Sequence, residues 1–219
     1  MNTDNIAEDV NGVNMVWQAA RMAGRDSYHH GDLRAALVAA GVAAAREGGA
    51  DAVRLNRLAA RVGVSPAAAY RHFPGGLEEL LTAVGDVCRQ QLAERLVERV
   101  EQVGRSTGGA RRASARFRAS GLAYVEYVTE QPGLFQVATR HDGAPASVSG
   151  PYALLEQYLD DLVSAGVLPA GRRPWAPAAA WATVHGLALL LTEGPLRRLS
   201  AEQRRQVVDR TLDMVEAGL

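Results

Sequence analysis

The chain has 219 residues, enough for a small domain and a larger one with its own core. It is 47% hydrophobic but only 5% aromatic, and its 24 basic and 24 acidic residues leave no net charge, as is typical of an alanine- and leucine-rich helical protein. Its only cysteine, Cys88, excludes an internal disulfide and favours a cytoplasmic location, and no apolar run reaches the roughly 20 residues that span a membrane.

Residues 1–26 are interpreted as an N-terminal extension. Apolar side chains recur there at rough helical spacing, but Met22 offers a second start for the chain. We therefore expect residues 1–21 to have little structural role.

Residues 55–73, with the sequence LNRLAARVGVSPAAAYRHF, predict two short helices joined by a tight turn. Apolar residues recur at helical spacing in the first helix: Leu55, Leu58, Ala59 and Val62. Gly63 can adopt the left-handed backbone conformation that ends a helix. The hydroxyl of Ser65 can cap the second helix, and Pro66 suits its first position because a missing N–H costs nothing there.

So short a connection makes the two helices cross steeply, and the small Ala59 and Ala69 allow a close approach. The pattern predicts a helix-turn-helix whose second helix, residues 65–73, offers its N-terminal side chains to DNA base edges. Residues 54–71 include no acidic residue but four arginines: Arg54, Arg57, Arg61 and Arg71. Taken by itself, the arginine cluster fits a solvated helix face. Because the cluster coincides with the cap and the turn glycine, we favour DNA binding.

Residues 28–81 resemble the N-terminal domain of TetR-type transcriptional regulators. The resemblance is carried by the segments YHHGDLRAAL, AREGGADAV, LAARVGVSPAAAYRHF and ELLTAV. It implies an all-α protein with a three-helix DNA-binding head at residues 27–76 and a helical-bundle domain for effector binding and dimerisation at residues 77–219. It also implies a homodimer on a palindromic operator. For residues 1–21, a basic arm in the DNA minor groove is then the alternative.

The resemblance further implies which residues contact DNA. Asn56 is chemically suited to adenine, whereas the alanines of the second helix can only touch a thymine methyl. Tyr70 and His72 match a pair that contacts the DNA backbone and positions the protein. The lysine that usually follows this helix is missing, and free N–H groups near Gly76 could replace its phosphate contact. The predicted interface is Arg54, Asn56, Arg57, Ser65, Pro66, Ala67, Ala68, Tyr70, Arg71 and His72.

Beyond the head the periodicity stays helical and predicts no strand. A long amphipathic stripe from Leu77 to Val103 links head and body and ends at a glycine-rich break, residues 104–109. Further helices are predicted at residues 110–129, 132–139 and 151–165, with a mobile loop at residues 141–150.

The last two helices predict a dimerisation surface. Residues 177–193 are apolar nearly all round, which requires burial on most sides. Ser200 and Gln203 predict a capping box at the start of the final helix. That helix carries an apolar stripe: Val208, Leu212, Val215 and Leu219. Paired with a second copy, the two helices would form an isologous four-helix interface; the alternative is that both only close the core of the monomer.

Trp181, His185 and Gly186 in the segment WATVHGLALL, together with PGLFQVATR at residues 132–140, resemble the C-terminal domain of one TetR subfamily. One hypothesis is that His185 lines an apolar effector cavity. The residues of that predicted cavity are Phe117, Tyr124, Tyr127, Trp181, His185 and Leu189. The alternative is a core histidine bonded to the backbone, beside a glycine that permits close helix packing.

The sequence therefore favours a ligand-responsive transcriptional repressor that binds a double-stranded DNA operator and is released by a small-molecule effector. An enzyme is the competing class, but the chain shows no nucleophile elbow, phosphate loop, HExxH motif or cysteine pair. We expect no catalytic activity, no cofactor, no metal and no membrane contact. A helical protein-interaction module without DNA binding is the alternative function, and it predicts no salt-dependent affinity for DNA.

Overall fold

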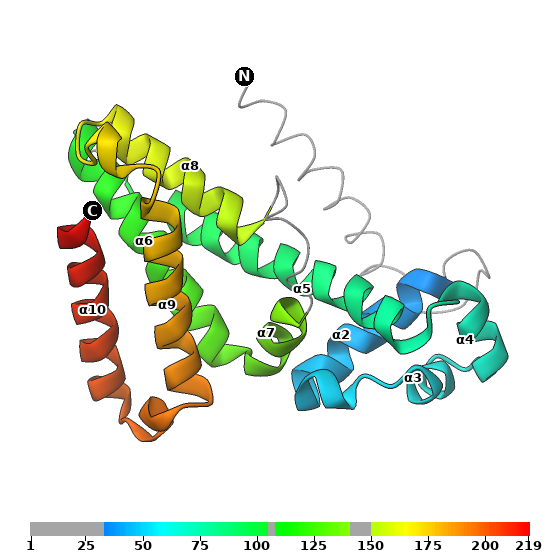
Figure 1. Cartoon of the computed structure of the whole chain (residues 1–219). Helices are drawn as coiled ribbons and strands as arrows, with labels where there is room; N and C mark the ends of the chain where they lie inside the picture. The colour runs from blue at the N-terminus through cyan, green and yellow to red at the C-terminus, as the bar shows by residue number, and fades with distance from the viewer. Residues whose placement is uncertain (1–32, 105–107, 141–149) are drawn as a thin grey trace. The chain divides into compact units, whose positions relative to one another are not determined.

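A computed structural model describes residues 33–104, 108–140 and 150–219 (Figure 1). Every regular element in these ranges is helical, as the sequence predicted. All but the first residue of these elements belong to one unit, residues 34–219. The predicted extension at residues 1–26 and nearly all of the loop predicted at residues 141–150 lie outside the described residues. None of the described helices is both long and apolar enough to cross a membrane.

Three helices form the head: α2 (Leu33–Ala52), α3 (Leu55–Arg61) and α4 (Pro66–His72). The backbone of α2 leaves helical geometry at Gly48 and Gly49, where Gly49 has a φ of 66°. This break turns the chain toward α3. The head buries a small apolar core that includes Leu37, Val53, Leu58 and Phe73, each 2% exposed or less.

The turn between α3 and α4 has the predicted structure. Gly63 adopts a φ of 76°, and its N–H donates to the carbonyl of Ala60 at 3.2 Å. The N–H of Val64 donates to the carbonyl of Ala59 at 2.9 Å, which completes the left-handed cap of α3. The Ser65 hydroxyl accepts from the N–H of Ala68 at 3.2 Å, so α4 begins with its N-cap satisfied.

The body consists of longer helices. They are α5 (Gly76–Glu101), α6 (Gly109–Glu130), α7 (Pro132–Thr139), α8 (Pro151–Ser164), α9 (Ala176–Thr192) and α10 (Ala201–Gly218). Two 3₁₀ turns, Ala170–Arg172 and Pro195–Arg198, precede α9 and α10. The predicted boundaries of α7 are confirmed, those of α6 differ by one residue at each end, and that of α8 differs by one residue at its C-terminal end. The capping box of Ser200 and Gln203 is present as well.

Two helices organise these elements. The predicted stripe of α5 is buried from Leu80 through Cys88 to Val100. Helix α6 packs against α5, α8, α9 and α10. Helix α7 contacts α5, and Gly133 brings it against α2, because a Cβ at this position would collide with the carbonyl oxygen of Ala45. The head is thus joined to the body both by α5 and by direct contact between α2 and α7.

Candidate DNA interface, cavity and subunit surface

The second helix of the helix-turn-helix turns one side to solvent. On α4, Ala69 is fully buried and Ala68 is half-buried, whereas the other predicted contact residues are exposed: Pro66, Ala67, Tyr70, Arg71 and His72. Ser65, at the N-cap, is exposed as well. The structure therefore places nearly all of the predicted α4 contacts on a surface that a DNA groove could reach.

The arginines of this surface differ in their partners. Arg61 forms an ion pair with Glu47 at 3.2 Å. Arg54 lies 3.5 Å from Asp51 and donates to the carbonyl of Val53 at 3.0 Å. The sequence showed no acid between residues 54 and 71, but the fold brings acids from α2 to two of the four arginines. Arg57 and Arg71 are exposed and have no ion pair within the described ranges, so they carry the uncompensated positive charge, beside exposed Asn56.

Arg34 of α2 is a residue that the sequence interpretation missed. Its guanidinium donates to the carbonyl of His72 at 3.3 Å and lies 3.4 Å from the Glu79 carboxylate. It also stacks over the ring of Phe73, 4.4 Å from the ring centroid. Arg34 thereby fixes the C-terminal end of α4. Arg34 stands in the segment YHHGDLRAAL, but its partners His72, Phe73 and Glu79 lie far along the chain, so no local pattern indicates this role.

The expectation of free N–H groups near Gly76 is wrong at two positions. The N–H of Gly76 donates to the carbonyl of Phe73 at 2.8 Å, and the N–H of Gly75 donates to the Glu79 carboxylate at 3.0 Å. Two acidic side chains, Glu78 and Glu79, also occupy the first turn of α5. An anion is disfavoured beside them, so this helix end does not replace the missing lysine.

The body contains a mostly apolar cavity that encloses about 420 Å³, partly open to solvent. Three of the predicted effector residues line it: Phe117, Tyr124 and Trp181. The other three, Tyr127, His185 and Leu189, are not part of its wall. Residues that the sequence interpretation did not single out complete the wall: Leu96, Ser120, Gly121, Pro151, Leu155, Ala180, Val184, Leu212 and Val215. Among the described residues, no charged side chain lines this cavity.

His185 lies behind the cavity wall and contacts two of its side chains, Tyr124 and Trp181. Its Nδ1 is hydrogen-bonded to the Tyr124 hydroxyl at 2.9 Å, and its ring stacks on Trp181 with 5.8 Å between centroids. Tyr124 meets Trp181 edge-on at 5.1 Å. The histidine is therefore bonded to a lining side chain, a role that neither of the two sequence hypotheses specified. A Cβ at Gly186 would meet no atom within 4 Å, so packing within one chain does not require this glycine.

The last two helices bury different shares of their apolar surface. The predicted stripe of α10 faces its own chain: Val208 and Leu212 are buried, and Val215 and Leu219 are partly buried. This stripe therefore packs within its own chain. Helix α9 keeps an uncovered side instead. Its exposed residues are Ala178, Ala179, Ala182, Thr183 and Leu190, with the open Gly186 among them.

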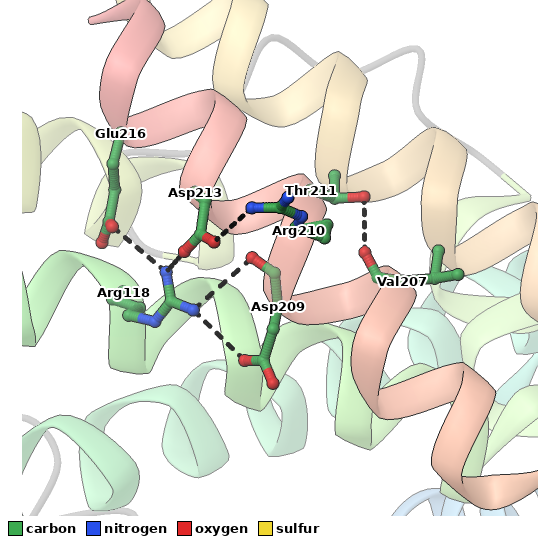
Figure 2. Close-up of polar contacts among 7 residues, drawn as sticks. All are labelled: Arg118, Val207, Asp209, Arg210, Thr211, Asp213 and Glu216. Atoms are coloured by element: carbon green, nitrogen blue, oxygen red, sulfur yellow. Dashed lines mark hydrogen bonds and ion pairs between the residues drawn. The ribbon is translucent and has the colours of Figure 1, made fainter.

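One arginine fastens α10 to α6 (Figure 2). The Arg118 guanidinium lies 2.9 Å from Asp213, 3.1 Å from Glu216 and 3.2 Å from Asp209. These three carboxylates recur on one side of α10, so a single cation holds two turns of that helix. Burial alone would lower the pKa of Arg118, but the carboxylates of Glu216 and Asp213 outweigh it and raise that pKa.

Comparisons with known proteins agree with this architecture. Residues 37–84 match a family described as "Bacterial regulatory proteins, tetR family", and residues 117–215 match "Tetracyclin repressor-like, C-terminal domain". A protein with unknown function from Rhodococcus sp. RHA1 is 28% identical, with a TM-score of 0.71 over 89% of this chain and 99% of the other. A TetR variant from Acinetobacter baumannii AYE, solved in complex with minocycline, is 20% identical and shares the fold. Its TM-score is 0.59 over 83% of this chain and 93% of the other. No protein of curated function matches the chain.

Replacing Arg118 with alanine should lower the free energy of unfolding by about 1 to 2 kcal/mol at low salt, because several exposed ion pairs are lost together. The loss should shrink as added salt screens the carboxylates that remain. Urea denaturation at two ionic strengths measures both effects.

The matched control is Arg210→Ala, which removes the same charge from α10. Arg210 is 84% exposed and has one pair, with Asp213 at 3.9 Å, so little change is expected. Equal losses of stability in the two variants would contradict the role of Arg118.

Proposed function

Because the chain belongs to the TetR family of bacterial regulatory proteins, we propose that it represses transcription as a homodimer and leaves its DNA operator when an effector binds. Members of this family are DNA-binding regulators and not enzymes. The exposed helix-turn-helix surface carries the proposal. In this division residues 1–26 are an extension, residues 27–76 bind DNA, and residues 77–219 bind the effector and dimerise. Such a protein works in the cytoplasm, where the operator is.

The predicted DNA contacts divide by chemistry. Arg57 and Arg71 supply the charge that lacks an internal partner and attracts phosphates. The exposed positions at the start of α4 are proline and alanine, which reach a thymine methyl but donate no side-chain hydrogen bond. Base discrimination therefore rests on Asn56 and Arg71, whereas Tyr70 and His72 position the protein on the DNA backbone. Arg54, occupied by Asp51 and nearby carbonyls, needs to exchange partners before it contacts a phosphate.

The uncovered side of α9 supports a two-fold dimer. Small residues at Ala179, Ala182 and Gly186 allow two helices to approach closely, and Leu190 adds an apolar contact. Met214 of the neighbouring helix α10 is 74% exposed and would be covered in the same interface. An isologous contact of this kind presents two heads to two half-sites, as a palindromic operator demands.

The wall of the cavity limits the effector to a neutral, largely apolar molecule. No ionised group is present to compensate a buried charge. The Ser120 hydroxyl already donates to the carbonyl of Phe117 at 2.7 Å, and Tyr124 is bonded to His185. An effector with an aromatic or aliphatic body and few polar atoms fits these surroundings.

Helix α5 offers a route from the cavity to the heads. Leu96 of α5 lines the cavity, and the same helix places Val84 against Gly41 of α2 in the head. We propose that an effector favours a state in which α5 holds the heads at a separation that does not match the operator. The rival function, a protein-interaction module without DNA binding, gives no reason for uncompensated arginines on a helix-turn-helix.

Replacing Arg71 with alanine should lower affinity for an operator selected from random DNA by about tenfold and reduce the salt slope by about one counterion. The loss of one phosphate or base contact explains both changes. Fluorescence anisotropy at several salt concentrations measures them. The charge-matched control Arg210→Ala should bind normally, and an unaltered Arg71→Ala complex would rule out this contact.

Replacing Gly186 with arginine should convert the dimer to a monomer, because the new side chain enters the uncovered side of α9. Folding should persist, since a Cβ at this position meets no atom within 4 Å. Sedimentation velocity gives the mass, and circular dichroism reports the helix content. The control is Gly171→Arg, at another position with open space. A dimer that survives Gly186→Arg would place the interface elsewhere.

Replacing Val184 with tryptophan should fill part of the cavity and abolish release by neutral aromatic compounds, while operator affinity stays unchanged. Release of a fluorescent operator by a panel of such compounds, and by their carboxylate analogues, provides the measurement. Val167→Trp, at a position 42% exposed and outside the cavity, is the control. Equal release from both variants, or equal potency of the carboxylates, would refute the proposed cavity chemistry.

A further inference from the structure

A second cleft lies where the head meets the body. Its wall includes Arg46 of α2, Glu94 and Glu98 of α5, Tyr127 and Glu130 of α6, and Gln131 beside α7. It encloses about 570 Å³, part of which is open to solvent, and it shares no lining residue with the apolar cavity. Whereas the first cavity is lined mostly by apolar side chains, most of this wall is charged or amide-bearing.

Tyr127 has an unused hydrogen-bonding group at this cleft. The residue is only 7% exposed, and its hydroxyl has no hydrogen-bond partner in the described part of the protein. A buried hydroxyl without a partner is energetically costly, so such groups are rare and mark a place for a ligand or water. Burial raises the pKa of Tyr127, as does nearby Cys88, and Arg46 only partly opposes this. The phenol is therefore protonated and able to donate.

The charges of the cleft are incompletely paired. Arg95 lies 3.7 Å from Glu130, but within the described ranges Arg46 donates only to the neutral Gln131 amide oxygen, at 3.2 Å. The Glu94 carboxylate accepts from a neutral partner, the Gln90 amide, at 3.2 Å. Glu98 has no ion pair within the described residues. The cleft thus offers one cation and two carboxylates that lack an opposite charge.

We propose that this cleft binds a small zwitterion of the amino-acid class. Its carboxylate accepts from the Arg46 guanidinium and the Tyr127 hydroxyl, and its ammonium group donates to Glu94 and Glu98. A simple anion would meet three carboxylates, and a simple cation would leave Arg46 and the Tyr127 hydroxyl without an acceptor. Only a ligand with both charges satisfies all of these groups.

The position of the cleft gives such a ligand a regulatory effect, which rests on the proposed repressor function. Arg46 belongs to α2 of the head, whereas Glu94, Glu98 and Tyr127 belong to the body. A ligand that bridges them restricts how α2 moves against α5 and α7. Operator affinity then depends on this ligand through a site distinct from the apolar cavity.

Binding is tested first without DNA, so that it stands apart from repressor function. Isothermal titration calorimetry of the full chain uses the common L-amino acids singly at millimolar concentration. For each amino acid that binds, its methyl ester and its N-acetyl derivative are titrated too. We expect at least one amino acid to bind and both derivatives, which lack one charge, to bind at least tenfold more weakly.

Tyr127→Phe tests the site itself. It removes the unpaired hydroxyl and preserves the ring, so folding should be unchanged or more stable. Affinity for the amino acid should fall about tenfold, the cost of one charge-assisted hydrogen bond. Arg46→Gln should lower it further. Arg99→Gln, on α5 but outside the cleft, is the control.

Three results would overturn the proposal. They are the absence of binding by any amino acid, equal binding by the charge-deleted derivatives, and normal binding by Tyr127→Phe. The first, combined with a less stable Tyr127→Phe variant, would assign the hydroxyl to an ordered water. A shift of operator affinity by the bound amino acid, measured afterwards, tests the regulatory effect alone. If the bound amino acid does not shift operator affinity, the binding site stands and only the proposed regulatory effect is refuted.

Discussion

The buried side of α5 belongs to two cores at once. Near its start Val84 packs beside Gly41 of the head, and further along the helix Leu96 and Val100 pack in the body. A helix of 26 residues is roughly 39 Å long, and burial at both ends prevents either part from turning without the other. The apolar cavity and the polar cleft both border α5. The two proposed ligands, of different chemistry, would therefore act through the same helix.

The two ligand sites are separated by one turn of α6. Tyr124 faces the apolar cavity, where its hydroxyl is satisfied by His185, and Tyr127 faces the polar cleft, where its hydroxyl is not. The same residue type therefore has opposite roles on two sides of a helix. In the cavity a hydrogen-bonded polar pair stands beside an apolar wall, whereas in the cleft the Tyr127 hydroxyl has no partner among the described residues and supports the proposed polar ligand.

The subunit surface depends on how α10 is held. Arg118 forms ion pairs with three carboxylates of α10, and the apolar stripe of that helix packs within its own chain. What remains for a second copy is the small-residue side of α9, with Gly186 at its centre and Met214 beside it. In the proposed dimer, α9 meets its symmetry mate while Arg118 holds α10 against its own chain.

Local physics alone determined the helices and their ends. Gly63, Ser65 and Pro66 act within a few residues of their own positions, and helical periodicity identified α5 to α10 nearly to their termini. Partners distant in sequence were decided only by tertiary structure. Glu47 and Asp51 compensate two of the four arginines, Arg34 anchors α4, and Tyr127 is separated from the cavity that Tyr124 lines. Periodicity states which residues share a side of a helix, but only packing decides which other helix that side meets.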